Sequence, residues 1–389
     1  MEKQTVGVIF GSRSAEHDVS IVTAIAAIIN PLKRSNKYNV IPIYISKDGS
    51  WYADEKLGDI RLYSTGQIEQ FLQKVKPVSL SFTNGLSLIT LGLKNKETKI
   101  DIAFPATHGT YGEDGSLMGV LRMANAPFVG CDLAASAVAM DKVLSKQIAE
   151  YENTPVTPWV WCSKADYAQR KDEITQQINQ LQYPLFVKPA HLGSSIGITR
   201  IKAPGELDNA LEVALHYDDK ALVEQAVNNL IEVTVPVIGN ETPRPGLVER
   251  PLSLTDEGVF DFETKYIGQG KAKGGKMAGA KQGAQGYSEL PAKLDPKLYK
   301  QCEQTALNVY KALGCSGIAR VDLLIDSKTN KVYFNEINPL PGSLYFHNWR
   351  AAGTSPLQLA EELLELAQDR HKKQQTLNTT FSTNFLKQF

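Results

Sequence analysis

The chain has 389 residues, of which 42% are hydrophobic and 22% are charged. This composition excludes collagen-like and disordered chains, and the length suggests two or three domains with at least one full core. The 42 basic residues balance the 42 acidic ones, so no net charge attracts nucleic acid or an acidic membrane. A small ligand is the favoured partner, and no nucleic-acid partner is expected.

The apolar stretches are too short for a membrane span. The strongest, residues 21–29, has about half of the roughly 20 residues required, and Thr23 interrupts it. The first residues resemble neither a secretory signal nor a targeting peptide. Four scattered cysteines show no CxxC or metal-ligand spacing, so we expect reduced thiols that pack in the core. We therefore expect a cytoplasmic enzyme without a membrane partner.

The N-terminal part alternates strands and helices. A strand over residues 6–10, a helix over 19–32 and a strand over 38–45 form a strand–helix–strand unit, and another strand follows at 100–104. Strands joined in this way are parallel. We predict an open parallel α/β sheet for residues 1–125, with its active loops at the C-terminal ends of the strands.

The rest of the chain divides into two further units and a tail. For residues 126–219 we predict helices over 141–150 and 172–181 and strands over 185–188 and 197–201. Residues 220–373 are rich in strands, predicted at 221–224, 232–238, 247–254, 319–325 and 331–336, with helices over 296–313 and 356–372. Residues 374–389 are polar and weakly periodic, and a disordered tail is expected.

Three loops contain residues that could carry chemistry. The loop at 11–20 fits either a helix start capped by Ser14 or a functional loop. In HGTYGEDG, residues 108–115, turn geometry explains the glycines but neither His108 nor Glu113. Residues 188–197 combine a lysine, glycines and serines, which can bring charge, amides and hydroxyls to phosphate oxygens, although the pattern is not a Walker loop.

Two predicted strands near the C-terminal end bring charged residues together. Arg320 and Asp322 alternate on one strand, and Glu336 and Asn338 alternate at the end of the next. Two carboxylates and an amide oxygen on adjacent strands suit Mg²⁺ shared with nucleotide phosphates. A surface ladder of ion pairs is the alternative, but the apolar neighbours of these residues indicate a buried sheet.

With these residues in this order, the chain resembles the D-alanine:D-alanine ligases of the ATP-grasp superfamily. The matched stretches are SAEHDVS (14–20), HGTYGEDG (108–115), ASAVAMDKVLSK (135–146), FVKPAHLGSSIGI (186–198), ALVEQ (221–225), ARVDLL (319–324) and NEINPLPG (335–342). The resemblance extends from residue 6 to about residue 367. It implies a three-domain α/β ATP-grasp fold, with ATP between the central unit, 126–219, and the C-terminal unit, 220–373.

The resemblance also implies roles for single residues. Those expected to contact ATP are Lys142, Lys188 and Ser195 at the phosphates, Glu224 at the adenine and Glu232 at the ribose. Those expected to hold two Mg²⁺ ions, or Mn²⁺ in their place, are Asp322, Glu336 and Asn338. Those expected to order the donor amino acid and the closing loop are Glu16, Ser194 and Tyr266, flanked by His108 and Glu113. Those expected to stabilise the tetrahedral oxyanion are Arg320 and the Gly342 amide.

The chain departs from the family pattern in two places. The family's serine contact to the acceptor carboxylate corresponds to His347, and a nearby threonine is missing, while Lys265, the other acceptor contact, is retained. These changes leave the acceptor open. Residues 268–286 form a glycine- and lysine-rich insertion, which fits either a solvated loop or a basic lid over the nucleotide.

The implied activity is ATP-dependent ligation of D-alanine to D-alanine through an acyl phosphate, for peptidoglycan precursors, in a homodimer. One alternative is a related ligase whose acceptor is D-lactate, D-serine or a secondary-metabolite amine. Another is a catalytically silent nucleotide-binding regulator. The silent protein is disfavoured because the metal ligands and Arg320 are all present.

Overall fold

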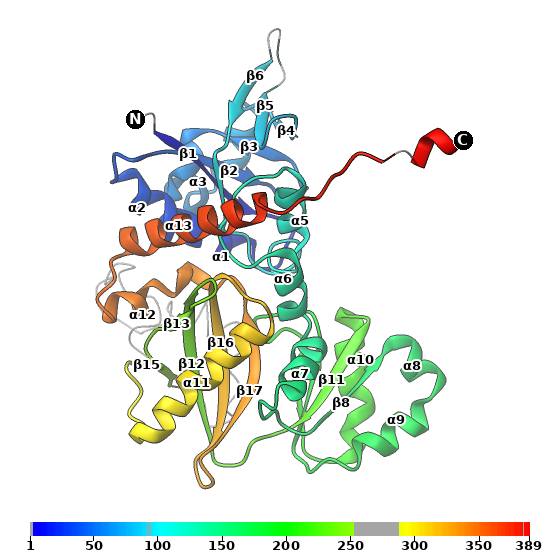
Figure 1. The fold of residues 1–389 in the computed structure, drawn as a ribbon. Helices are drawn as coiled ribbons and strands as arrows, with labels where there is room; N and C mark the ends of the chain where they lie inside the picture. Colours follow the sequence, from blue (N-terminus) through cyan, green and yellow to red (C-terminus); the bar gives the residue numbers. More distant parts are fainter. Residues whose placement is uncertain (1–2, 91, 93–94, 253–287, 384) are drawn as a thin grey trace.

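The structure is a computed structural model, and it describes residues 3–90, 92, 95–252, 288–383 and 385–389. In these residues, three four-stranded sheets carry most of the fold (Figure 1). Lys265, Tyr266 and the insertion at 268–286 lie outside the described residues.

The N-terminal sheet has the order β3-β2-β1-β7. Its strands are β1 (Gln4–Gly11), β2 (Tyr38–Ile45), β3 (Trp51–Ala53) and β7 (Ile102–Pro105). Strand β1 runs parallel to β2 and β7, as predicted, but the edge strand β3 is antiparallel to β2. The turn between β2 and β3 is too short for a parallel crossover, and therefore the sheet is mixed.

A second, smaller sheet in this part of the chain was not predicted. Its antiparallel strands are β4 (Val78–Ser81), β5 (Ser87–Thr90) and β6 (Lys96–Lys99). It projects beyond the N-terminal sheet (Figure 1). Each strand has four residues and β6 is largely exposed, so the sequence has little hydrophobic alternation to reveal it.

The predicted helix at 19–32 is confirmed as one helical segment with an irregular centre. It contains α1 (His17–Val22), the π-helical η1 (Thr23–Ile29) and α2 (Asn30–Lys33). The other helices before residue 152 are η2 (Glu55–Gly58), α3 (Ile60–Ser64), α4 (Ile68–Leu72), α5 (Ser116–Met123), α6 (Leu133–Met140) and α7 (Lys142–Tyr151). π-Helical turns are uncommon and often lie at functional sites.

The middle sheet is antiparallel and has the order β10-β9-β11-β8. Its strands are β8 (Trp159–Ser163), β9 (Leu185–Pro189), β10 (Thr199–Ile201) and β11 (Lys220–Gln225). The helices beside it are α8 (Lys164–Gln169), α9 (Lys171–Ile178), η3 (Pro204–Glu206) and α10 (Leu207–Tyr217). The strand predicted from residue 197 begins at Thr199, because the residues before it belong to the turns of the loop.

The C-terminal sheet is also antiparallel, with the order β13-β12-β16-β17. Its strands are β12 (Leu230–Gly239), β13 (Arg244–Pro245), β16 (Gly317–Asp326) and β17 (Lys331–Asn338), and α11 (Pro296–Ala312) packs against it. The strand predicted at 247–254 is reduced to β14 (Arg250–Pro251), paired with β15 (Ser288–Glu289), within the described residues.

The last long helix packs the C-terminal part of the chain against the N-terminal sheet. After η5 (Gly342–Tyr345) and α12 (Phe346–Ala351), α13 (Pro356–Gln375) lies across the N-terminal sheet (Figure 1). Leu359, Leu363 and Leu364 share one buried cluster with Val6 and Val8 of β1. The predicted unit 220–373 therefore contains a helix whose apolar face completes the N-terminal core.

Arg370 of α13 fastens this helix to two parts of the chain. Its guanidinium donates to the carbonyl oxygens of Phe128 at 2.7 Å and Gly130 at 2.5 Å, and to the Ser316 hydroxyl at 2.5 Å. The tail beyond α13 is exposed and holds the short η6 (Phe385–Gln388), so its predicted disorder stays a prediction. The four cysteines are free and buried, as expected.

Among the described residues, no helix has both the length and the apolar character needed to cross a membrane.

Candidate active site

The loops after the parallel strands β1 and β7 meet at the same edge of the sheet and form the first wall of the site. Gly109 has a φ of +68°, and a Cβ there would lie 2.9 Å from Glu16 Oε2, so glycine is required for this approach. Helix α1 begins directly after Glu16. Ser14, expected as its cap, instead accepts the Glu16 amide at 3.1 Å. The Ser194 hydroxyl donates to the Glu16 carboxylate, a contact between two residues that were predicted to lie together.

Two buried titratable side chains stand behind Glu16. The Gly109 amide donates to Glu113 Oε2 at 2.6 Å, and Glu113 Oε1 has no hydrogen-bond partner in the described part of the chain. Burial and the nearby Glu16 carboxylate raise the pKa of Glu113 well above its ordinary value. Burial lowers the pKa of His108 to about 4. His108 is therefore neutral at neutral pH, and burial favours the uncharged form of Glu113. Glu16 is the nearby carboxylate that can pair with an ammonium group.

Thr23, at the start of the π-helical segment, connects this wall to the loop after β17. Its Oγ1 accepts the Ser343 amide at 2.8 Å and lies 2.8 Å from His108 Nε2. This hydroxyl can donate its own proton to Nε2 when the neutral His108 ring carries its proton on Nδ1. In the sequence, Thr23 shows only as an interruption of an apolar run.

The opposite wall contains three buried lysines, two of which pair with Glu224, whose side chain is 2% exposed. Lys146 Nζ lies 2.9 Å from Glu224 Oε2, Lys188 forms a second ion pair with Glu224, and the Thr157 hydroxyl donates to it at 2.8 Å. Burial acts to raise the pKa of Glu224, but the two ammonium groups hold it well below its ordinary value. Burial lowers the pKa of Lys146, and Glu224 and Glu336 raise that of Lys188 despite burial.

Lys142 is the third lysine and joins the middle and C-terminal sheets. Its Nζ donates to the Leu192 carbonyl at 2.6 Å and lies 3.4 Å from Glu336 Oε2. Lys142 and Lys146 are one helical turn apart on α7, and this spacing is the signal by which Lys146 could have been found. The site thus combines cations from α7 and β9 with a carboxylate from β17.

The strand register places the predicted metal ligands side by side. Asp322 pairs with Glu336 across β16 and β17, and Arg320 pairs with Asn338. Arg320 donates to both Asp322 oxygens, at 2.8 Å and 2.6 Å. Two carboxylates and an amide oxygen on paired strands form a donor set that fits Mg²⁺.

The turn after β17 has an unusual backbone. Ser343, Leu344 and Tyr345 have φ values of 52°, 53° and 53°, all in the left-handed region that costs non-glycine residues energy. The turn brings the Tyr345 hydroxyl 2.8 Å from Thr234 Oγ1 and its ring 5.6 Å below the Arg320 guanidinium.

His347, predicted as an acceptor contact, is paired with a buried carboxylate that sequence reasoning did not find. Its Nε2 lies 2.8 Å from Glu249 Oε2 and 3.0 Å from Oε1, and Glu249 is 2% exposed. Burial acts to raise the pKa of Glu249, but its hydrogen bond with His347 lowers it below the ordinary value. His347 therefore stands in the site beside a buried carboxylate.

The structure thus brings most of the predicted residues to one region between the three sheets. Glu232 lies on β12, which pairs with β16, and Ser195 lies in the loop after β9 with a φ of 60°. Gly342 begins the turn after β17. Tyr266 and Lys265 were predicted beside these residues and lie outside the described part of the chain.

Two family models cover most of the chain. The model described as "D-ala D-ala ligase N-terminus" matches residues 5–131, and "D-ala D-ala ligase C-terminus" matches residues 148–365. The D-alanine–D-alanine ligase B of Clostridium tetani is 36% identical over 371 residues, covering 94% of each chain. That of Chlorobium phaeovibrioides is 37% identical over 381 residues, covering 94% of this chain and 98% of the relative.

The chain belongs to the D-alanine–D-alanine ligase family. The family's solved structures agree with the fold described above. The D-alanine–D-alanine ligase of Coxiella burnetii superposes with a TM-score of 0.78 at 28% identity and covers 97% of both chains. The VanG D-Ala:D-Ser ligase of Enterococcus faecalis has the same TM-score at 30% identity, covering 94% of this chain and all of that one. The ATP-grasp fold predicted from the sequence is confirmed.

Proposed function

We propose that this ligase uses ATP to join two D-alanine molecules for peptidoglycan precursors. The observation that supports this most directly is the meeting of Lys142 and Lys188 with Glu336, next to the Arg320–Asp322 pair. Cations and oxygen ligands in one place suit the transfer of a phosphoryl group to a carboxylate. Family membership supports the substrates.

In the proposed reaction, a carboxylate oxygen of the donor amino acid attacks the γ-phosphorus of ATP, and ADP leaves. Lys142 and Lys188 offset the negative charge of the transferring group. Glu16 pairs with the donor's ammonium group, while His108 is neutral behind it and burial favours the uncharged form of Glu113. Ser194 holds residues 188–197, which we call the phosphate loop, against Glu16.

The acceptor's amine then attacks the acyl carbon, loses a proton, and phosphate leaves. Arg320 and the Gly342 amide are the proposed donors to the oxyanion that forms at this carbon. Asp322, Glu336 and Asn338 would hold Mg²⁺, which when bound supplies charge to the phosphate oxygens. Ser195, Glu224 and Glu232 are the further proposed contacts to ATP, and Tyr266 and Lys265 those to the closing loop and the acceptor.

We place the acceptor's carboxyl group near His347, where the chain departs from the family pattern. The Glu249 carboxylate beside His347 offsets any positive charge that the ring could offer, so the acceptor's carboxylate depends more on Lys265. This argument keeps D-serine or D-lactate as the second candidate acceptor. We also propose a cytoplasmic homodimer, on the resemblance to the family.

The proposal is tested by ADP release with the pure protein, ATP and Mg²⁺, followed by mass spectrometry of the product. We expect release with D-alanine alone and formation of D-alanyl-D-alanine, and none with L-alanine. D-serine and D-lactate are added separately beside D-alanine to rank the acceptors. Lys188→Ala is the matched negative control. If a mixed product formed in preference to the D-alanine dipeptide, the proposed acceptor would change to D-serine or D-lactate. If no pair released ADP, the proposed ligase activity would be refuted.

A further inference from the structure

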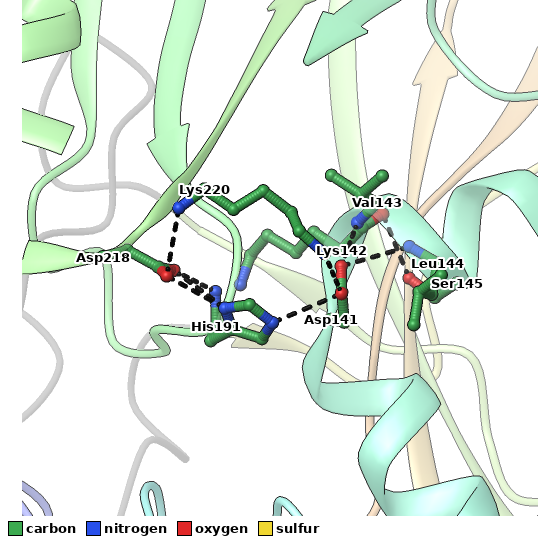
Figure 2. Close-up of polar contacts among 8 residues, drawn as sticks. All are labelled: Asp141, Lys142, Val143, Leu144, Ser145, His191, Asp218 and Lys220. Carbon is green, nitrogen blue, oxygen red and sulfur yellow. Dashed lines mark hydrogen bonds and ion pairs between the residues drawn. The ribbon is translucent and has the colours of Figure 1, made fainter. Parts of the chain in front are cut away.

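A second set of charged residues lies behind the phosphate loop, outside the groups that the reaction uses (Figure 2). His191, the third residue after Lys188, has a carboxylate on each side of its ring. Its Nδ1 lies 2.9 Å and 3.1 Å from the two Asp218 oxygens, and its Nε2 lies 3.2 Å from Asp141 Oδ2. The backbone amide of His191 also donates to Asp218, at 2.7 Å.

The two carboxylates belong to different elements. Asp141 is the N-cap of α7, and its Oδ1 accepts the amides of Val143 at 2.9 Å and Leu144 at 3.1 Å. Asp218 directly follows α10 and precedes β11. The imidazole therefore bridges the start of α7 to the start of β11.

The groups around the ring balance a protonated histidine. Lys220 Nζ lies 2.5 Å from Asp141 Oδ2, so the two carboxylates face two cations once His191 is charged. Asp219 also lies near the ring and is exposed, while Lys142, on the far side of Asp141, is turned toward Glu336. Asp218 and Asp219 could join His191 around a metal ion, but the two ring nitrogens already face opposite carboxylates, and a proton on each explains both contacts.

Three contacts in one place hold the phosphate loop to α7. The first residue of α7, Lys142, donates its amide to Ala190 at 3.1 Å and its Nζ to Leu192 at 2.6 Å. His191, between these two residues, reaches back to Asp141. Residues 190–192 are thereby fastened to the end of the helix that carries Lys142 and Lys146, immediately before the glycine and serines of the loop.

We propose that His191, as an imidazolium, is a positioning residue that clamps the phosphate loop to α7 through Asp141 and Asp218. This inference rests on the proposed function, because the clamp matters only if Lys142 and the loop amides must face the ATP phosphates together. His191 acts through these groups and does not itself touch the substrate.

The titration of the clamp has a definite sign. Its hydrogen bonds with Asp141 and Asp218 raise the pKa of His191 to about 9. The stabilisation that the charged clamp gives the folded protein is therefore fully present below the ordinary histidine pKa of 6.5. It is lost as the pH rises through about 9. Asp218 is held at a pKa of about 2 by His191 despite its burial, so it stays charged over this interval.

The test compares His191→Gln, which keeps a hydrogen-bond donor without charge, with His191→Arg, which keeps the charge. His216→Gln is the matched control, because His216 is exposed on α10. In the nucleotide-free protein at pH 7.5, hydrogen exchange at residues 190–197 should quicken in His191→Gln and stay near wild type in the other two. The kcat/KM for ATP of His191→Gln should fall about 10- to 100-fold, mainly through KM, as expected for a misplaced phosphate site.

The pH profile separates a charged clamp from simple packing. The affinity of wild type and of His216→Gln for Mg·ADP should weaken as the pH rises through about 9, and that of His191→Arg should not. A folded His191→Gln with wild-type exchange and a wild-type KM for ATP would overturn the proposal. So would a His191→Arg variant whose affinity for Mg·ADP weakens through about pH 9 as it does in wild type. Because exchange needs no substrate, a protein that clamps the loop but joins no amino acids would refute the proposed function alone.

Discussion

At the scale of single residues, a hydroxyl in the middle of an apolar helix has two tasks. Thr23 accepts a hydrogen bond from the Ser343 amide and contacts His108, so one atom connects the wall that contains Glu16 to the turn after β17. Nothing in the sequence separates such a threonine from one that fills space, because its partners lie far along the chain. The pattern predicted the helix, and the structure was needed for the contact.

Thr23→Val keeps the shape and removes both hydrogen bonds. We expect a loss of about 1–3 kcal/mol in the free energy of unfolding, because a buried amide loses its partner. The kcat should fall while the KM for ATP changes little, since the changed contacts lie away from the phosphate loop. Urea unfolding and steady-state kinetics measure both, and Thr23→Ser, which keeps the hydroxyl, is the control. Equal stability of the valine and serine variants would contradict the assigned role.

The His347–Glu249 pair gives a second prediction, in acid. The folded protein holds the pKa of Glu249 below its ordinary value of 4.5, so the pair stabilises the fold above about that pH and the benefit is lost as the pH falls further. In His347→Ser, the loss of unfolding free energy on acidification below that pH should be smaller than in wild type. Urea unfolding between pH 3.5 and 7 measures it. His216→Ser should follow wild type, and parallel curves for all three proteins would show that this pair does not set the acid response.

At the scale of elements, the sequence predicted what repeats within one strand or helix and missed what joins elements. The alternation of Arg320 and Asp322 with Glu336 and Asn338 was readable because side chains on a strand alternate with period two and the two strands are neighbours. Glu249 was not, because its partner lies 98 residues away. The strands β4 to β6 were missed because they are short and mostly polar.

Helix α13 makes the corresponding prediction about stability. Arg370→Met removes the guanidinium from three acceptors while keeping part of the apolar stem, and we expect the free energy of unfolding to fall by about 2–3 kcal/mol. Lys372→Met, exposed on the same helix, should change it by about 0.5 kcal/mol or less. Urea unfolding measures the free energy of unfolding of both variants and of wild type. If both variants matched wild type, α13 would be held by its apolar face alone.

At the scale of the whole molecule, the site is assembled from all three sheets, and Glu16 and Ser194 form a direct contact between the first and the second. Ser194→Ala removes this contact without touching the lysines. We expect the KM for the donor D-alanine to rise about tenfold, with the KM for ATP nearly unchanged, because the lost hydrogen bond orients the donor side. Initial rates at varied D-alanine and varied ATP separate the two, and Ser195→Ala serves as the neighbouring comparison. A rise confined to ATP would assign Ser194 to the phosphates instead.

The position of α13 also bears on how the chain is made. The sheet built from residues 4–105 is among the first parts to leave the ribosome, yet its apolar surface is closed by leucines of a helix that emerges only after residue 355. Until then, that surface stays open to water and to other nascent chains, as in the intermediates of large proteins. A transcript cut short before α13 should therefore yield a product that chaperones retain and proteases remove, even though it contains every residue assigned here to the chemistry.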